Sequence, residues 1–159
     1  MASDWSLPAA LSPALTTREA IADALHRCMI GMDTNDTALF DSAHTQDAQW
    51  NIGGRVVQGL QAIHRECYEK TIMTLDTTHY VTNIRIHVLD GASEGSLSAL
   101  YQAKHFRGQT GTVPGAPSYT MGGVYFLNLV KDETDGLWKI KEFRMKKLWV
   151  EGDPSVMGH

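Results

Sequence analysis

The sequence predicts one α+β domain in which three N-terminal helices pack on a mainly antiparallel sheet. Apolar residues recur at helical spacing from Ile21 to Met32 and again from Leu60 to Ile72. From Thr77 onward the apolar pattern has period two, which is typical of strands with one buried face. The turn dipeptides Asp90-Gly91 and Asp135-Gly136 separate these strands, as expected for hairpins. Helices first and a run of hairpins afterward therefore define the fold class.

The length and composition of the chain indicate a single globular domain. The chain has 159 residues, of which 43% are hydrophobic and 20% charged, so it can bury one core without disulfides or metal. We expect an arm over residues 1–15, a single domain over 16–150 and a tail over 151–159. The only two cysteines, Cys28 and Cys67, lie apart without Cys-x-x-Cys spacing, which argues against a zinc knuckle and favours a reducing compartment.

Charge and hydropathy exclude two classes of partner. The net charge is -4, and lysine and arginine are scattered rather than aligned, so neither nucleic acid nor an anionic membrane is an expected partner. No segment approaches the roughly 20 apolar residues of a membrane span, and residues 1–8 lack a secretory signal. We expect a soluble cytoplasmic protein.

The first predicted helix covers residues 17–33. Thr16 and Glu19 have the capping-box spacing. The apolar stripe then follows helical periodicity and comprises Ile21, Leu25, Cys28, Met29 and Met32. Asp33 closes that stripe just before Thr34-Asn35-Asp36 ends the helix. This carboxylate is either a turn residue or a group facing the interior of the domain.

Two further helices and a hairpin precede the long strands. Asp36 can cap a short helix over residues 37–43, and Gly53-Gly54 joins a strand at 48–52 to its partner at 55–58. A third amphipathic helix begins at Leu60. Long strands follow at 78–89, 96–107, 119–131 and 137–150.

The strand at residues 96–107 carries the first functional signal. Its apolar face consists of Leu97, Ala99, Tyr101, Ala103 and His105. Small residues beside a phenol and an imidazole suit a pocket wall, although a structural histidine bonded to a carbonyl fits this strand equally well. In the preceding strand, His79 has the wrong parity for the same face unless a bulge near Asn83 resets the register.

Cofactor signatures are absent from the sequence. It contains no Gly-x-Gly-x-x-Gly, Walker, Gly-x-Ser-x-Gly or His-Glu-x-x-His motif, and no His-x-His strand with a following glutamate. We therefore expect neither a cofactor nor a metal. The last strand has two apolar phases, which favours a homodimer or homotrimer.

Three short motifs carry a family resemblance. They are Met32-Asp33-Thr34-Asn35-Asp36, Thr77-Thr78-His79-Tyr80-Val81-Thr82-Asn83 and Tyr119-Thr120-Met121-Gly122-Gly123-Val124-Tyr125. With the order of elements, they resemble the SnoaL-like branch of the nuclear-transport-factor-like superfamily, which includes scytalone dehydratase and the bacterial bile acid dehydratase. The resemblance covers residues 16–150 and implies a cone-like α+β barrel, with a pocket between the helices and a curved sheet.

The resemblance also implies site residues. Asp33 and His79 match the Asp-His pair of these dehydratases, and His105 matches a second histidine of scytalone dehydratase. Arg144 lies near a position where the bile acid enzyme has a basic residue. Cys28 stands where both enzymes have a substrate-binding tyrosine, so this chain departs from them there.

These residues suggest acid-base chemistry on a carbonyl compound. We expect His79 to act as base, Asp33 to orient it, and His105 and Tyr101 to donate to an oxyanion or leaving hydroxyl. Trp50, Tyr125 and Phe126 are candidates for the apolar wall. The predicted function is a dehydratase, isomerase or cyclase that acts on a small hydrophobic polyketide- or terpenoid-like compound in secondary metabolism.

A non-catalytic module of the same fold, which binds a small molecule or assembles with proteins, is the alternative. An Asp33–His79 contact that faces an open pocket favours the enzyme. A pocket filled by large apolar side chains favours the module.

Overall fold

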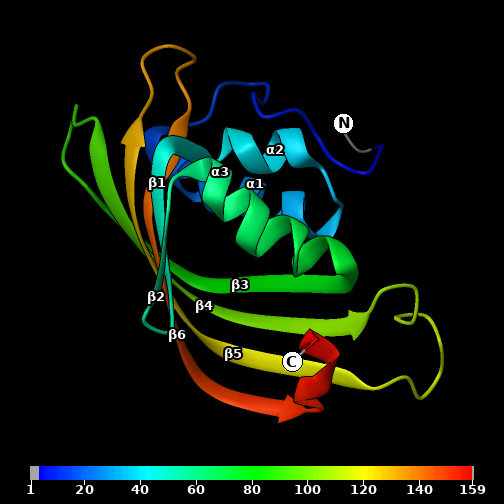
Figure 1. The fold of residues 1–159 in the computed structure, drawn as a ribbon. Helices are drawn as coiled ribbons and strands as arrows, with labels where there is room; N and C mark the ends of the chain where they lie inside the picture. The colour runs from blue at the N-terminus through cyan, green and yellow to red at the C-terminus, as the bar shows by residue number, and fades with distance from the viewer. Residues whose placement is uncertain (1–3, 159) are drawn as a thin grey trace.

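A computed structural model describes residues 4–158 and shows three α-helices against one curved six-stranded sheet (Figure 1). Within those residues, no helix is long and apolar enough to cross a bilayer. The helices are α1 (Thr17–Asp33), α2 (Thr37–Ser42) and α3 (Leu60–Ile63). The strands are β1 (His44–Ile52), β2 (Arg55–Gln58), β3 (Leu75–Val88), β4 (Glu94–Arg107), β5 (Ser118–Lys131) and β6 (Trp138–Gly152). Shorter turns are the π-helix His64–Glu69 (η1) and the 3-10 turns Ile72–Thr74 (η2) and Pro154–Met157 (η3).

The strand order in the sheet is β2-β1-β6-β5-β4-β3. Strand β1 runs parallel to β6, and every other neighbouring pair is antiparallel. The predicted α+β class and mainly antiparallel sheet are therefore confirmed. In Figure 1 the long strands curve beneath the helices, so the helices cover the concave face of the sheet.

Helix α1 forms as its capping box predicts. The Thr16 hydroxyl accepts the Glu19 main-chain N–H, and the Glu19 carboxylate accepts the Thr16 N–H at 2.8 Å. Its buried stripe packs in the core and ends at Asp33, where α1 contacts β3. The helix thus delivers a carboxylate to the concave face of the sheet.

Strand β3 contains the bulge that the parity of His79 requires. The pairing of β3 with β4 shifts between Thr82 and Arg85, and Asn83 has φ of 54°. Asparagine tolerates this left-handed conformation better than most residues. The bulge lets His79, before it, share the inner face with Ile84, after it.

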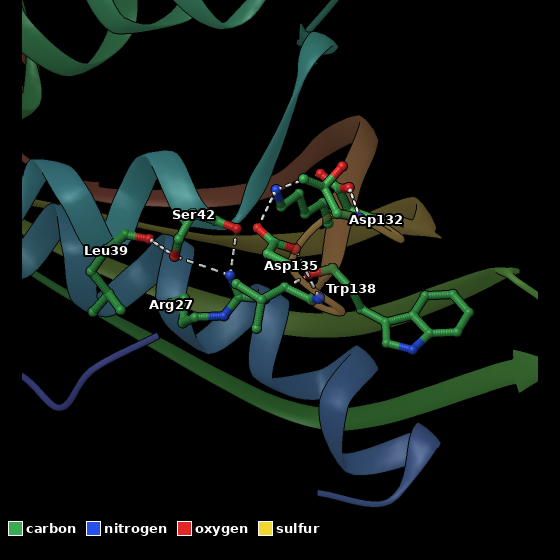
Figure 2. Close-up of polar contacts among 9 residues, drawn as sticks. Arg27, Leu39, Ser42, Asp132, Asp135 and Trp138 are labelled. Carbon is green, nitrogen blue, oxygen red and sulfur yellow. Dashed lines mark hydrogen bonds and ion pairs between the residues drawn. The ribbon is translucent and has the colours of Figure 1, made fainter. Parts of the chain in front are cut away.

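A buried arginine ties two helices to the sheet. Figure 2 shows Arg27 of α1 reaching Ser42 at the end of α2 and Trp138 at the start of β6. Its Nη2 donates to the Trp138 carbonyl at 2.6 Å, and its Nε donates to Asp23 at 2.9 Å. Because Arg27 is only 4% exposed, these partners are needed to compensate for burying its charge.

The two ends of the described chain differ in how they pack. Residues 4–15 contain no helix or strand, and the Ser6 hydroxyl donates to the Asp36 carboxylate at the start of α2. The C-terminal residues are more integrated than a tail, because β6 continues to Gly152 and Val156 packs against Leu75 and Tyr119.

Candidate active site

Asp33 and His79 form a tightly bonded pair where α1 meets β3. Asp33 Oδ1 lies 2.7 Å from His79 Nδ1, and Oδ2 accepts the His79 main-chain N–H at 2.7 Å. The Thr77 hydroxyl donates to Oδ1 at 2.8 Å. An ionised carboxylate can only accept, so Nδ1 carries the ring hydrogen and Nε2 of the neutral ring keeps a lone pair.

His79 lines a cavity of about 190 Å³ between the helices and the concave face of the sheet. Most of its wall is apolar and includes Met32, Trp50, Met121, Tyr125, Met145 and Met157. A larger and more open depression, of about 480 Å³, lies near His87, Glu94 and Lys141. The smaller cavity is the candidate active site because its wall is mostly apolar and includes His79, whose ring is bonded to Asp33.

His105 also lines the cavity, with its ring perpendicular to that of His79 and 5.7 Å away between centroids. Its Nδ1 lies 3.1 Å from the Tyr119 carbonyl oxygen, so Nδ1 donates there and Nε2 is an acceptor. Burial lowers the pKa of His105, which favours this neutral form. In this neutral form the Nε2 atom of His105 accepts a hydrogen bond from a ligand, in place of the donor role expected from the sequence.

Tyr101 lies outside the cavity wall, whereas its stacking partner Tyr125 belongs to it. The two rings are 4.0 Å apart and nearly parallel. The Tyr101 ring occupies the space above Gly123, where a Cβ would come within 2.9 Å of it. Burial raises the pKa of Tyr101 to about 12, and its hydroxyl has no hydrogen-bond partner among residues 4–158. The structure therefore separates Tyr101 from the predicted catalytic group.

Trp50 stands in the cavity wall as predicted, whereas Cys28 does not. Cys28 is fully buried, with Sγ 3.7 Å from Nε2 of His44. His44 Nδ1 donates to the Phe40 carbonyl at 2.8 Å, so the imidazole accepts from the thiol. Helical spacing turns Cys28 into the core, so the structure places this predicted substrate-binding residue outside the cavity wall.

Phe126 and Arg144 lie on the opposite face of the sheet from the cavity. Their neighbours Tyr125 and Phe143 point inward, and side chains alternate along a strand. The Arg144 guanidinium stacks over the Phe126 ring at 4.5 Å from its centroid, and Phe126 is 37% exposed. The structure therefore places both of these predicted substrate-binding residues away from the cavity.

Several wall residues have no counterpart in the sequence prediction. Met157 comes from η3, and Arg55 and Glu66 come from β2 and η1. The sequence contains seven methionines, and these flexible side chains were the only feature of the sequence that indicated an adaptable cavity wall. Thr77 shares the parity of His79 and so could have been assigned to the Asp33 site.

Within residues 4–158, no three His, Cys, Asp or Glu side chains are arranged to hold a metal.

The fold and site define a class of small α+β proteins with an Asp-His pair at an apolar cavity under a curved sheet. The SnoaL-like domain family matches residues 13–144, and the chain belongs to this family. It is also 44% identical over 153 residues to the terrestric acid biosynthesis cluster protein E of Penicillium crustosum, which covers 96% of this chain and 97% of that protein.

Solved structures share the fold at low sequence identity. A scytalone dehydratase-like protein of Novosphingobium aromaticivorans has a TM-score of 0.71 at 20% identity, covering 86% of this chain and 87% of its own. The hexachlorocyclohexane dehydrochlorinase LinA-type3 of Novosphingobium barchaimii has a TM-score of 0.67 at 19% identity, covering 88% and 92%. A Salmonella enterica protein of the nuclear transport factor 2-like superfamily has a TM-score of 0.69 at 13% identity, covering 84% and 94%. These structural similarities show that the chain shares the fold of these three proteins.

Proposed function

We propose that this protein is a cofactor-independent acid-base enzyme of secondary metabolism that acts as a dehydratase, isomerase or cyclase on a hydrophobic carbonyl compound. The observation that carries the proposal is the 2.7 Å Asp33–His79 hydrogen bond beside an apolar cavity. The relative named for a terrestric acid biosynthesis cluster supports secondary metabolism as the setting. A polyketide- or terpenoid-like substrate is consistent with that setting.

The proton transfer begins at His79. Nε2 takes the proton from the carbon next to a carbonyl group, and the C–H electron pair moves to the carbonyl oxygen as an enolate. The Asp33 carboxylate stabilises the imidazolium that forms, because the two groups are already hydrogen-bonded. In a dehydration, the imidazolium then returns its proton to the departing β-hydroxyl, which leaves as water. His105 Nε2 can hold that hydroxyl beforehand by accepting its hydrogen.

The volume of the cavity limits the size of the substrate. An apolar cavity of roughly 150 Å³ is known to take a benzene-sized guest. At about 190 Å³, the cavity of this protein fits one ring with a short substituent in the present conformation. We therefore expect single-ring or short-chain carbonyl compounds to be better substrates than polycyclic ones.

The arrangement favours an enzyme over a non-catalytic module. His79 lies at the wall of an open cavity, and its ring nitrogen is bonded to Asp33 rather than to a distant structural carbonyl. Large side chains do not fill the space between Trp50, His105 and Met145, which all border it. A module with a vestigial pocket would not require an oriented imidazole there.

Hydrogen–deuterium exchange provides a test that does not require the natural substrate. The protein is incubated in D2O with a panel of single-ring ketones and β-hydroxy ketones, and loss of the α-proton signal is followed by NMR. We expect the wild type to accelerate exchange, His79→Ala to abolish that acceleration, and His87→Ala, at an exposed histidine on the same strand, to retain it. Compounds that bind without any exchange would favour the binding module, and equal exchange by His79→Ala would refute the proposed base.

A further inference from the structure

Two charged side chains in the cavity wall, Arg55 and Glu66, belong to other elements than the Asp33–His79 pair. Arg55 begins strand β2, and Glu66 lies in the π-helix η1. Arg55 Nη2 donates to Glu66 Oε2 at 2.8 Å. The other carboxylate oxygen, Oε1, accepts from Arg65 Nη2 at 3.3 Å. One carboxylate thus faces two guanidinium groups, which leaves a local net positive charge in a chain whose overall charge is -4.

The local backbone explains why this cluster meets the cavity. Gly53 and Gly54, both with positive φ, turn the chain so that β2 pairs back on β1. The π-helix then presents the consecutive residues Glu66 and Cys67 to the cavity wall. π-helical turns are rare and recur at functional sites, because the extra residue per turn re-aims neighbouring side chains.

Arg55 retains capacity to bind a ligand. Its side chain is 61% exposed, and Glu66 occupies one of its five N–H donors among the interactions within residues 4–158. Among the described residues that line the cavity, Arg55 alone carries a permanent positive charge. Guanidinium groups bind carboxylates in a bidentate, strongly directional way.

We propose that Arg55 forms a carboxylate subsite at the mouth of the cavity. This inference rests on the proposed function and specifies its substrate class: a small carbonyl compound with a carboxylate remote from the carbon that loses its proton. The Arg55 guanidinium in the wall and the Asp33 carboxylate bonded to His79 orient such a compound with its anionic end toward Arg55 and away from His79. A remote carboxylate leaves the reacting C–H acidic, whereas an adjacent negative charge would oppose enolate formation.

Binding of cinnamate and of the isosteric neutral cinnamamide, measured by isothermal titration calorimetry at low salt, tests the subsite. We expect the wild type to bind cinnamate about tenfold more tightly than the amide, a ratio typical of one charge-assisted contact. Arg55→Gln should remove the preference. Glu66→Gln should enlarge it, because Arg55 then has no internal competitor.

Arg65→Gln is the matched control, because Arg65 bonds the same Glu66, has an equally exposed side chain of 61%, and is not part of the cavity wall. This variant should keep most of the preference for cinnamate. Equal binding of the two probes by the wild type, or a preference that survives in Arg55→Gln, would overturn the subsite.

The same titration separates this inference from the proposed function, because it needs no turnover. His79→Ala should still prefer cinnamate. A cinnamate preference in a protein that fails the deuterium-exchange test would support the subsite and reject only the enzyme.

Discussion

Asp33 accepts both the ring N–H and the main-chain N–H of His79, each at 2.7 Å. One carboxylate therefore fixes the orientation of the imidazole and the position of the strand that carries it. The pair joins the last residue of α1 to the first part of β3, 46 positions apart in the sequence. Its loss should affect both chemistry and packing at this junction.

Turnover should depend on the two residues as a unit. We expect His79→Ala and Asp33→Asn each to lower proton-transfer rates by about 10²-fold or more, since one removes the base and the other loses control of its tautomer. The double variant should be little worse than the worse single variant. Proton-transfer rates measured on the wild type, the two single variants and the double variant test this prediction. Additive effects, or a normal rate in His79→Ala, would contradict it.

Stability should separate the two single variants. The amide of Asp33→Asn keeps one acceptor oxygen, but its NH2 group would face either the His79 main-chain N–H or the two donors now bonded to Oδ1. This clash should cost about 1–2 kcal/mol of unfolding free energy. His79→Ala keeps the main-chain N–H and should cost less. Urea unfolding of both variants measures the difference, and the reverse order would count against the assigned hydrogen bonds.

Catalysis should be independent of divalent metals. Acid-base chemistry at His79 requires no Lewis acid, and the sequence lacks a metal-ligand motif. Dialysis against EDTA should leave the exchange rate unchanged. Activity that is lost on dialysis and restored by one divalent ion would show a metal mechanism.

Tyr101→Phe tests the donor role predicted for Tyr101 from the sequence. Its hydroxyl is buried without a hydrogen-bond partner among the described residues and lies outside the cavity wall. We expect turnover to be retained and the unfolding free energy to stay equal or rise by up to about 1 kcal/mol. A rate at least tenfold lower in a normally folded variant would restore Tyr101 to the catalytic group.

Acid should destabilise the protein through His44. Complete burial lowers the pKa of His44 to about 4, whereas the unfolded chain has the usual value near 6.5. Between these values the unfolded state binds the proton and the folded state does not, so stability falls as pH falls from 6.5 to 4, by up to about 3 kcal/mol. Urea unfolding across this range, with an NMR titration that should show His44 neutral at pH 5.5, checks the sign.

The homodimer or homotrimer expected from the sequence remains a prediction, and the structure offers a surface for it. The outer face of the sheet exposes Leu100, Phe126 and Trp149, each 37–45% exposed. We propose that a second copy covers this face. Light scattering should show a species larger than 17.6 kDa that Leu100→Asp dissociates, whereas Leu89→Asp, in the β3–β4 turn, should not. A wild type that is monomeric at micromolar concentration would disprove the assembly.

The sequence was most informative where local periodicity decides the answer. Helical spacing placed Asp33 at the end of the buried stripe of α1, and strand parity required the bulge at Asn83 that brings His79 inward. These two local rules made Asp33 and His79 candidates, whereas their assignment as a pair came from the family resemblance, and the distance between them depends on the tertiary fold.

The residue type alone predicted substrate contacts poorly where the sequence did not show which face of the sheet a side chain occupies or which residues lie beside it. Phe126 is aromatic like Tyr125, but adjacent residues on a strand point to opposite faces. The Arg55–Glu66 contact could not be predicted, because it depends on a π-helical turn that has no distinct hydrophobic period.

The methionines of the cavity wall have a consequence for how this protein changes over evolutionary time. They come from separate elements of the fold and are Met32, Met121, Met145 and Met157. Unbranched thioether side chains adopt many shapes at little cost, so mutations there alter the outline of the cavity without displacing the base at His79. A lineage with this architecture can acquire new substrates by small steps at the wall while each intermediate protein keeps a working proton-transfer pair.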